Sequence, residues 1–214
     1  MPGFQHVYRK LFRHYGPQDW WPGDSPFEIM VGAVLTQNTA WTNVEKAIAN
    51  LKAADALSVE AIVGSHPKRL ASWLRPSGYY NIKAKRLRAF CRWLQQQGGE
   101  SQLVTRDTAT LRRDLLSVHG IGPETADDIL LYAFNRPVFV IDAYTRRIFS
   151  RYGLVEGDEP YEHLRERIES ALQADAGVYN EYHALIVVHA KDACRKRPRC
   201  RDCCLAGDCR SAAY

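Results

Sequence analysis

The sequence predicts an all-α protein, and three observations lead to this fold class. Apolar residues recur at helical spacing along most of the 214 residues. Alternation typical of a strand is confined to Val138–Ile141. A turn with two glycines joins two predicted helices within residues 115–130, which is typical of an αα-hairpin. The chain contains no internal repeat, so solenoid and propeller architectures are excluded.

Composition and charge indicate what kind of all-α protein this is. Hydrophobic residues make up 46% and charged residues 25% of the chain, as in ordinary globular proteins. The net charge of +5 is mild, but basic residues gather near the C-terminus and around residues 83–86. No apolar run approaches the ~20 residues that cross a bilayer, and the N-terminus lacks the apolar core of a signal peptide. We therefore expect a cytosolic protein without membrane contact, whose six cysteines bind a metal or cluster instead of forming disulfides.

The N-terminal segment predicts one amphipathic helix and an aromatic loop. Apolar side chains fall on one face of residues 4–15, and Gly16-Pro17 ends the run. Trp20 and Trp21 follow in the loop, where adjacent tryptophans are costly to leave exposed. They would either plug a joint between two lobes or form a wall on which a base stacks.

The middle of the chain predicts a series of helices separated by caps and breakers. The first is nearly all apolar, begins at Pro26 behind a Ser25 or Asp24 cap, and ends in the polar run of residues 36–39. The turn at residues 75–85 leads into a basic helix that Gly98-Gly99 ends. The remaining helices are predicted from Trp41 to about Leu51, as two short helices in 57–74 that separate at Pro67, from Ala84 to Gln97, and from about Thr108 into the glycine turn.

The glycine turn is the most informative stretch. Gly120 can adopt backbone angles that other residues avoid, and Pro123 is tolerated in the first turn of the next helix. Glycines let a phosphate approach the backbone, and amides at a helix N-terminus face it with the positive end of the helix dipole. Such a turn holds a nucleic-acid backbone without distinguishing bases. The alternative is an ordinary hairpin with no ligand. After Asp142, amphipathic helices are predicted at 143–152, about 161–175 and 178–192.

The C-terminal tail has the pattern Cys194-x5-Cys200-x2-Cys203-x5-Cys209. Zinc ribbons usually offer two C-x2-C pairs held apart, whereas this tail has one. Four thiolates at short spacings are typical of iron–sulfur clusters. We therefore favour a cluster over zinc. Arg195 and Arg197 would then lie on a rigid basic loop that faces phosphates.

These motifs resemble the endonuclease III superfamily of DNA glycosylases. VHGIGPETA resembles its helix-hairpin-helix, and VFVIDAYTRRIFSRYGL resembles the following segment, with Asp142 at the aspartate that those enzymes share. The tail resembles their [4Fe-4S] loop, with one residue fewer between the first two cysteines, which leaves Cys204 as a substitute ligand. The resemblance implies a two-lobed helix-hairpin-helix glycosylase fold. Its six-helix barrel would span residues 26–136, and a cluster lobe would join 1–25 to 137–214, with the iron–sulfur loop at 194–209.

The resemblance also implies site residues. Gln37 in LTQNT would enter the duplex where the flipped nucleotide was, although from the residues alone a helix-terminus hydrogen bond is the simpler role. Tyr79 would be the wedge in the G-x-Y-N-x-K-A segment that includes Lys83, and the alternative is a solvated helix face. Asp142 would stabilise the sugar cation or activate water, as well as cap its helix. The residues expected to hold the DNA backbone are His119, Gly120, Gly122, Arg195 and Arg197.

Glu124 is an informative departure from the family pattern. Bifunctional relatives have a lysine there that attacks the sugar and cleaves the strand through a Schiff base. A carboxylate cannot form an imine, so we expect a monofunctional enzyme that leaves an abasic site, unless a lysine elsewhere substitutes. Trp20, Trp21 and Trp41 with Glu124 would suit a cationic base. Their motifs also resemble the 3-methyladenine glycosylase branch, whose characterised member lacks the cluster.

The sequence thus predicts a DNA glycosylase of base excision repair. The expected partner is double-stranded DNA with a damaged base. We expect a monomer in the cytoplasm of a bacterium or archaeon, associated with the nucleoid. The preferred substrate is an alkylated purine of the 3-methyladenine type. Alternatives are an enzyme for oxidised, deaminated or mismatched bases, with or without lyase activity, and a DNA-damage binder without catalysis.

Overall fold

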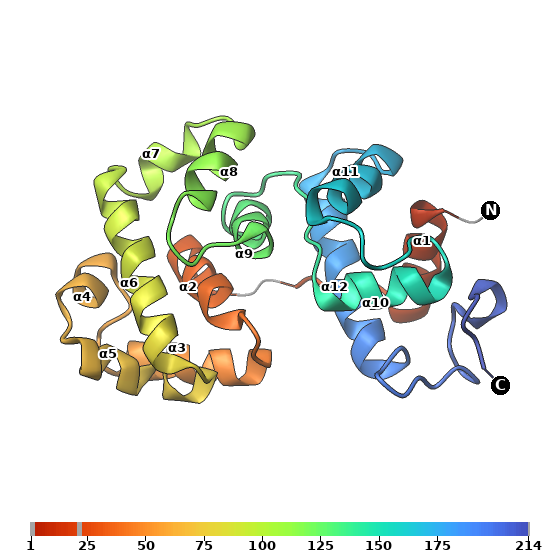
Figure 1. The fold of residues 1–214 in the computed structure, drawn as a ribbon, viewed down its shortest axis with the longest axis horizontal. Helices are drawn as coiled ribbons and strands as arrows, with labels where there is room; N and C mark the ends of the chain where they lie inside the picture. The colour runs from red at the N-terminus through yellow and green to blue at the C-terminus, as the bar shows by residue number, and fades with distance from the viewer. Residues whose placement is uncertain (1–2, 21–22, 214) are drawn as a thin grey trace. The chain divides into compact units, whose positions relative to one another are not determined.

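The computed structural model describes residues 3–20 and 23–213, in which every regular element is a helix (Figure 1). Val138–Ile141 has no regular secondary structure. In the described ranges, no helix combines the length and apolar character of a membrane crossing. The α-helices are α1 (Phe4–Tyr15), α2 (Pro26–Thr36), α3 (Trp41–Ala53), α4 (Val59–Gly64), α5 (Pro67–Trp73), α6 (Tyr80–Gln96), α7 (Glu100–Val104), α8 (Thr108–Leu116), α9 (Pro123–Asp128), α10 (Ala143–Tyr152), α11 (Tyr161–Ala171) and α12 (Ala176–Asp192). The short helical turns are η1 (Arg75–Ser77), η2 (Ile129–Ala133), which has π geometry, and η3 (Ala206–Asp208).

The chain divides into two compact units. The central unit contains residues 21–134, and the terminal unit joins residues 1–20 to residues 135–214. Each unit has its own apolar core, as is typical of a folding domain.

Helix α2 is the core of the central unit. All its residues from Glu28 to Leu35 are buried, and it packs against α3, α6, α9 and η2 (Figure 1). The Ser25 side chain caps it by accepting a hydrogen bond from the Glu28 amide at 3.2 Å. Gly32 lies directly under the Trp41 ring, where an added Cβ would stand 3.1 Å from Cη2. This glycine therefore lets the tryptophan pack closely on α2.

The hairpin of α8, α9 and η2 is fixed by a buried ion pair. Arg112 Nε donates to Asp127 Oδ1 at 2.6 Å and Nη2 donates to Oδ2 at 3.1 Å, and the Asp127 side chain is fully buried. A bidentate arginine–carboxylate pair sets both distance and orientation. It therefore fixes α8 relative to α9, on either side of the glycine turn.

The terminal unit is built around α12, which packs against α1 and α10. Tyr182 of α12 is fully buried and donates a hydrogen bond to the Phe4 carbonyl at 2.8 Å. Phe4 in turn meets Phe149 edge to face, with ring centroids 5.0 Å apart. Burial of aromatic rings stabilises the folded state of this unit by several kcal/mol. These contacts therefore hold the N-terminal helix to the C-terminal helices.

Several elements differ from the sequence-based expectation. Helix α6 begins at Tyr80, before the expected Ala84, because Tyr79 adopts the left-handed conformation (φ +44°) and lets the helix start at once. Helix α7 was not expected, since it has five residues and only Leu103 is buried. Helix α11 ends at Ala171, before the expected residue 175.

Candidate functional site

The two glycines of the hairpin turn serve different purposes. Gly120 has φ +89°, and an added Cβ would overlap the Cγ of Arg86. Gly122 is the N-cap of α9, has φ −96°, and would leave an added Cβ with no neighbour within 4 Å. Gly120 is therefore required by the fold, whereas the space at Gly122 is open to a phosphate. His119 beside them is exposed.

Gln37 is joined to this turn by hydrogen bonds. Its Nε2 donates to the Gly120 carbonyl at 3.0 Å and to Thr125 Oγ1 at 2.9 Å, and Arg86 Nη1 donates to its Oε1. The Gln37 side chain therefore forms hydrogen bonds with the hairpin turn, and not with the end of its own helix as the simpler alternative held. The residue expected to enter the duplex and the turn expected to hold phosphates form one network within the central unit.

Lys83 was expected to contact DNA, and the structure contradicts a direct contact. Its side chain is buried, and Nζ donates to the Leu35 carbonyl at 2.7 Å and to the Ser77 carbonyl at 2.6 Å. Burial, together with the nearby charge of Arg86, lowers the pKa of Lys83 to about 8. Thr39 Oγ1 donates to the same Ser77 carbonyl at 2.5 Å. Lys83 therefore positions the Gln37 loop against the Tyr79 turn from inside the unit.

Tyr79 is 70% exposed, which is unusual for so large an apolar ring. Ile82, one turn further along α6, is 50% exposed. The two side chains form an apolar projection at the N-terminus of α6. An exposed aromatic ring on a fixed turn has the shape required of a wedge between bases.

Asp142 caps α10, as the sequence predicted. Its Oδ1 accepts from the Thr145 amide at 2.7 Å and from Thr145 Oγ1 at 2.8 Å. The other oxygen, Oδ2, lies 3.7 Å from Nε2 of His183, and 15% of the side chain remains exposed. Burial alone would raise the pKa of Asp142, but the hydrogen bond and charge of His183 together with the Thr145 donors hold the pKa below its ordinary value of 3.8. Asp142 is therefore a carboxylate at neutral pH.

His183 is a site residue that sequence reasoning missed. It lies on α12, is 6% exposed, and stacks on Trp20 with ring centroids 6.1 Å apart and planes 14° apart. The only signal in the sequence is a histidine within the apolar pattern of residues 178–192. Trp20, His183 and Asp142 thus form a continuous row within the terminal unit.

Two other residues expected in a base pocket lie in the central unit. Trp41 is half-buried against α2, and Glu124 is exposed in the first turn of α9. Trp21 lies outside the described residues.

The four cysteines of the predicted cluster loop surround one cavity. Cys194, Cys200, Cys203 and Cys209 all line it, whereas Cys204 does not. Among the described residues, no three His, Cys, Asp or Glu side chains converge closely enough to hold a single metal ion. A zinc ion would bring its thiolates within about 4 Å of each other, given Zn–S bonds of about 2.3 Å.

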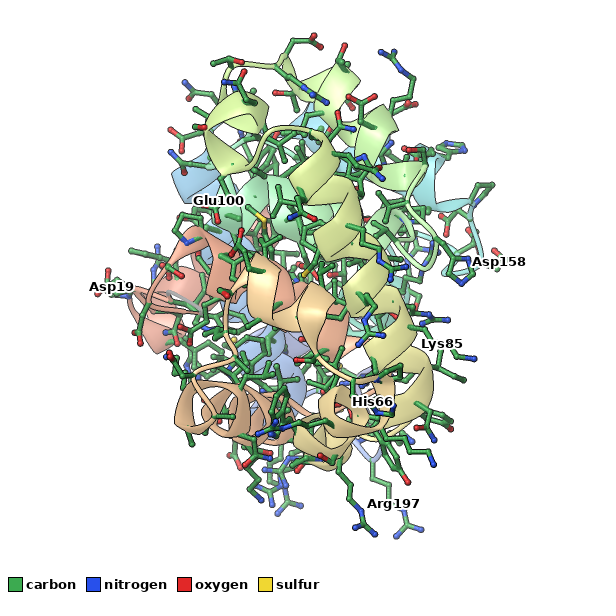
Figure 2. All side chains as sticks on the ribbon, turned by 90° about the vertical axis from the view of Figure 1, so that its left-hand side faces the viewer. Asp19, His66, Lys85, Glu100, Asp158 and Arg197 are labelled. Atoms are coloured by element: carbon green, nitrogen blue, oxygen red, sulfur yellow. The ribbon has the colours of Figure 1, made fainter. Side chains whose placement is uncertain are left out.

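The cysteine tail is anchored by side chains to main-chain carbonyls. Arg147 Nε donates to the Cys194 carbonyl at 2.9 Å, and Arg151 donates to the carbonyls of Arg195 at 2.6 Å and Lys196 at 3.1 Å. Arg195 and Arg197 are exposed, and Figure 2 shows Arg197 pointing away from the ribbon.

Sequence comparison places the chain among DNA repair proteins. Residues 31–174 match the family model of the HhH-GPD superfamily of base excision DNA repair proteins. A Methanocaldococcus jannaschii protein with the provisional name DNA repair glycosylase is 45% identical over 208 residues, which cover 96% of this chain and 94% of that protein.

Two solved structures have a similar fold. The 3-methyladenine DNA glycosylase of H. pylori, bound to 1,N6-ethenoadenine, has a TM-score of 0.74 at 31% identity and covers 86% of this chain and 95% of its own. An endonuclease III–DNA complex has a TM-score of 0.84 at 20% identity and covers 97% of this chain and 94% of its own, which shows the fold alone. The expected all-α, two-lobed helix-hairpin-helix fold is confirmed.

Proposed function

Because the chain belongs to the HhH-GPD superfamily of base excision DNA repair proteins, we propose that it is a monofunctional DNA glycosylase. It would act as a monomer on double-stranded DNA with a damaged base, hydrolyse the N-glycosidic bond, and leave an abasic site. The observation that carries this proposal is the ionised Asp142, held at a helix N-terminus with one carboxylate oxygen outside the cap.

The geometry of Asp142 suits this chemistry. Cleavage of the bond between base and sugar builds positive charge on the sugar, as in other glycoside cleavages. Oδ1 is fixed by the two Thr145 donors, so the orientation of Oδ2 is fixed as well. Oδ2 takes no part in the cap, lies 3.7 Å from His183 Nε2, and belongs to a side chain that is 15% exposed, so it has acceptor capacity for a water or a sugar. Asp142 would stabilise the sugar cation and take the proton of the attacking water.

The lysine chemistry of bifunctional relatives finds no support at the hairpin. Glu124 stands where those enzymes have the nucleophilic lysine, and a carboxylate forms no imine. Lys83 has a pKa low enough for an amine nucleophile, but its Nζ is buried and donates to two main-chain carbonyls. Both observations support hydrolysis by water.

An alkylated purine is the proposed substrate. Such a base is cationic, and an indole face attracts a cation. Trp20, stacked on His183 beside Asp142, offers one such face, and half-buried Trp41 offers another in its own unit. A structural relative with 31% identity is named a 3-methyladenine DNA glycosylase. These points favour alkylated bases over the oxidised bases and mismatches that remain the alternative.

We propose that the cysteine loop holds a [4Fe-4S] cluster, because four of its thiols line one cavity. Cys194, Cys200, Cys203 and Cys209 would hold it, and Cys204 would remain a free thiol, since it does not line the cavity. When bound, the cluster would supply structural rigidity to a loop that has almost no regular secondary structure. Arg195 and Arg197 would then present fixed charges to phosphates.

A base-release assay tests the proposal. The wild-type protein is incubated with duplexes that each carry one defined lesion, including 3-methyladenine, 5-hydroxycytosine, uracil and a mismatch, and the released base is identified. We expect release of the alkylated purine and an uncut strand. Borohydride trapping on the same duplexes should give no covalent adduct; an adduct would establish a lyase. Release of another base only would overturn the substrate, and binding without any release would overturn the enzyme.

A further inference from the structure

Helices α5 and α6 are strongly basic. Together they carry seven lysines and arginines and no aspartate or glutamate, although the net charge of the whole chain is only +5. A charge run of this kind on two neighbouring helices is costly through self-repulsion, unless counterions or an anionic partner compensate it.

Three of the seven cations have structural partners and do not line the groove between the two helices. Lys83 donates to the Leu35 and Ser77 carbonyls, Arg86 donates to Gln37, and the Arg69 guanidinium lies 5.3 Å from the Trp73 ring centroid. These three therefore hold the unit together and are not available to a partner.

The other four line one groove between α5 and α6, which we call the basic groove: Lys68, Lys85, Arg88 and Arg92. It is open and has a volume of about 520 Å³. Lys68, Lys85 and Arg92 are exposed, and Figure 2 shows Lys85 pointing away from α6. None of the four forms an ion pair with a described acidic side chain. Arg88 donates to the Ser65 carbonyl through Nη2, but its Nε is buried without a hydrogen-bond partner in the described chain.

The groove continues from the surface expected to meet DNA. On α6 its lining begins at Asn81, two residues after the exposed Tyr79. From Asn81 to Arg92 the helix rises about 16 Å at 1.5 Å per residue, and this length matches about five nucleotides at 3.4 Å each. Apart from Asn81, the remaining lining residues are alanines and a proline, so the groove is lined by none of the large apolar or aromatic side chains that anchor a protein partner.

We propose that the basic groove binds the phosphate backbone of the duplex that flanks the damaged base on one side. The inference rests on the proposed function, because it takes Tyr79 to be at the lesion. Its charges would add affinity without reading sequence, and would extend the DNA contact beyond the hairpin and the cysteine loop.

The test measures the salt dependence of DNA binding for Lys85→Gln, Arg92→Gln and the double variant. Lys46→Gln, which removes one exposed cation from α3 of the same unit, is the matched control. The probe is a duplex with a reduced abasic-site analogue, placed either near the 5′ end or near the 3′ end, so that only one flank is long. We expect the slope of log K against log salt to fall by about 0.9 for each groove cation removed, on one of the two duplexes only, with no change for Lys46→Gln.

The outcomes are distinct. An unchanged slope for the double variant on both duplexes would overturn the groove contact, and an equal loss on both would overturn the assignment to one flank. Thermal melting confirms that the variants are folded, and Lys68→Gln on α5 repeats the test from the other wall of the groove. Base release by the wild-type protein is measured separately on duplexes that carry a damaged base, so a failure of the proposed function is seen separately from a failure of the groove.

Discussion

The two units of this protein differ in what their polar side chains do. In the central unit, Gln37, Arg86 and Lys83 are used to hold loops in place, and the groups left open to a ligand are mostly backbone, cations and the Tyr79 ring. In the terminal unit, Asp142 stands at a helix end with a histidine beside it, and cysteines surround a cavity.

From this difference we expect the two units to have different roles in the proposed reaction. The central unit has the features of a surface that grips and distorts a duplex, and the terminal unit has those of a reaction centre. The Gln37–hairpin network lies within the central unit, and the row of Trp20, His183 and Asp142 lies within the terminal unit, so their effects on binding and on chemistry should be separable by mutation. Substitutions in the central unit should change the affinity for DNA, and those in the terminal row of Trp20, His183 and Asp142 should change the rate of base release.

The largest effect is expected for Asp142→Asn. The amide keeps the size of the side chain and one oxygen for the cap, but it loses the charge that stabilises the sugar cation. Base release should fall by about 10²- to 10⁴-fold, while binding to lesion duplex stays near the wild-type level. Single-turnover release and fluorescence anisotropy measure the two quantities. Release at the wild-type rate would remove Asp142 from the chemistry.

The second effect tests the cysteine tail. Cys200→Ser removes one of the thiols that line the cavity, so the iron content should fall and amide exchange in residues 194–209 should accelerate. Exchange in α6 of the central unit should not change. Cys204→Ser is the matched control, because Cys204 does not line the cavity and its loss should leave the iron content intact. Equal iron loss in both variants would show that Cys204 is a ligand.

The two glycines of the hairpin give a third, smaller pair of effects. Gly120→Ala places a Cβ at φ +89° and against Arg86, so the fold should lose about 1–3 kcal/mol of unfolding free energy. Gly122→Ala meets no neighbour, so its stability should stay within about 0.5 kcal/mol of the wild type. DNA affinity should nevertheless fall for Gly122→Ala, because the new methyl group occupies the space of the phosphate. Denaturant unfolding and anisotropy compare the two; unchanged affinity for Gly122→Ala would place the phosphates elsewhere.

The sequence predicted features that depend on neighbouring residues. The helical class, a cap at Ser25 or Asp24 and the glycine turn all follow from local patterns; the structure confirms the class and the turn and has Ser25 as the cap. Features that depend on distant residues were not predictable. Gln37 bonds Gly120 across 83 positions, and nothing near Lys83 in the sequence indicates that its ammonium is buried on two carbonyls. His183 was missed for the same reason, since only folding brings α12 to the start of α10.

His183 also gives the smallest predicted effect, which tests whether the terminal row acts as a unit. Its interaction lowers the pKa of Asp142, so the carboxylate contributes stability above pH about 4 that is lost as the pH falls through the lowered pKa. His183→Asn should therefore raise this pKa, and the acid limb of the base-release profile should move to higher pH. His163→Asn, an exposed histidine on α11, should leave the limb in place. A limb that moves in neither variant would mean that His183 supports Trp20 alone, and that the charge of Asp142 is set by its cap.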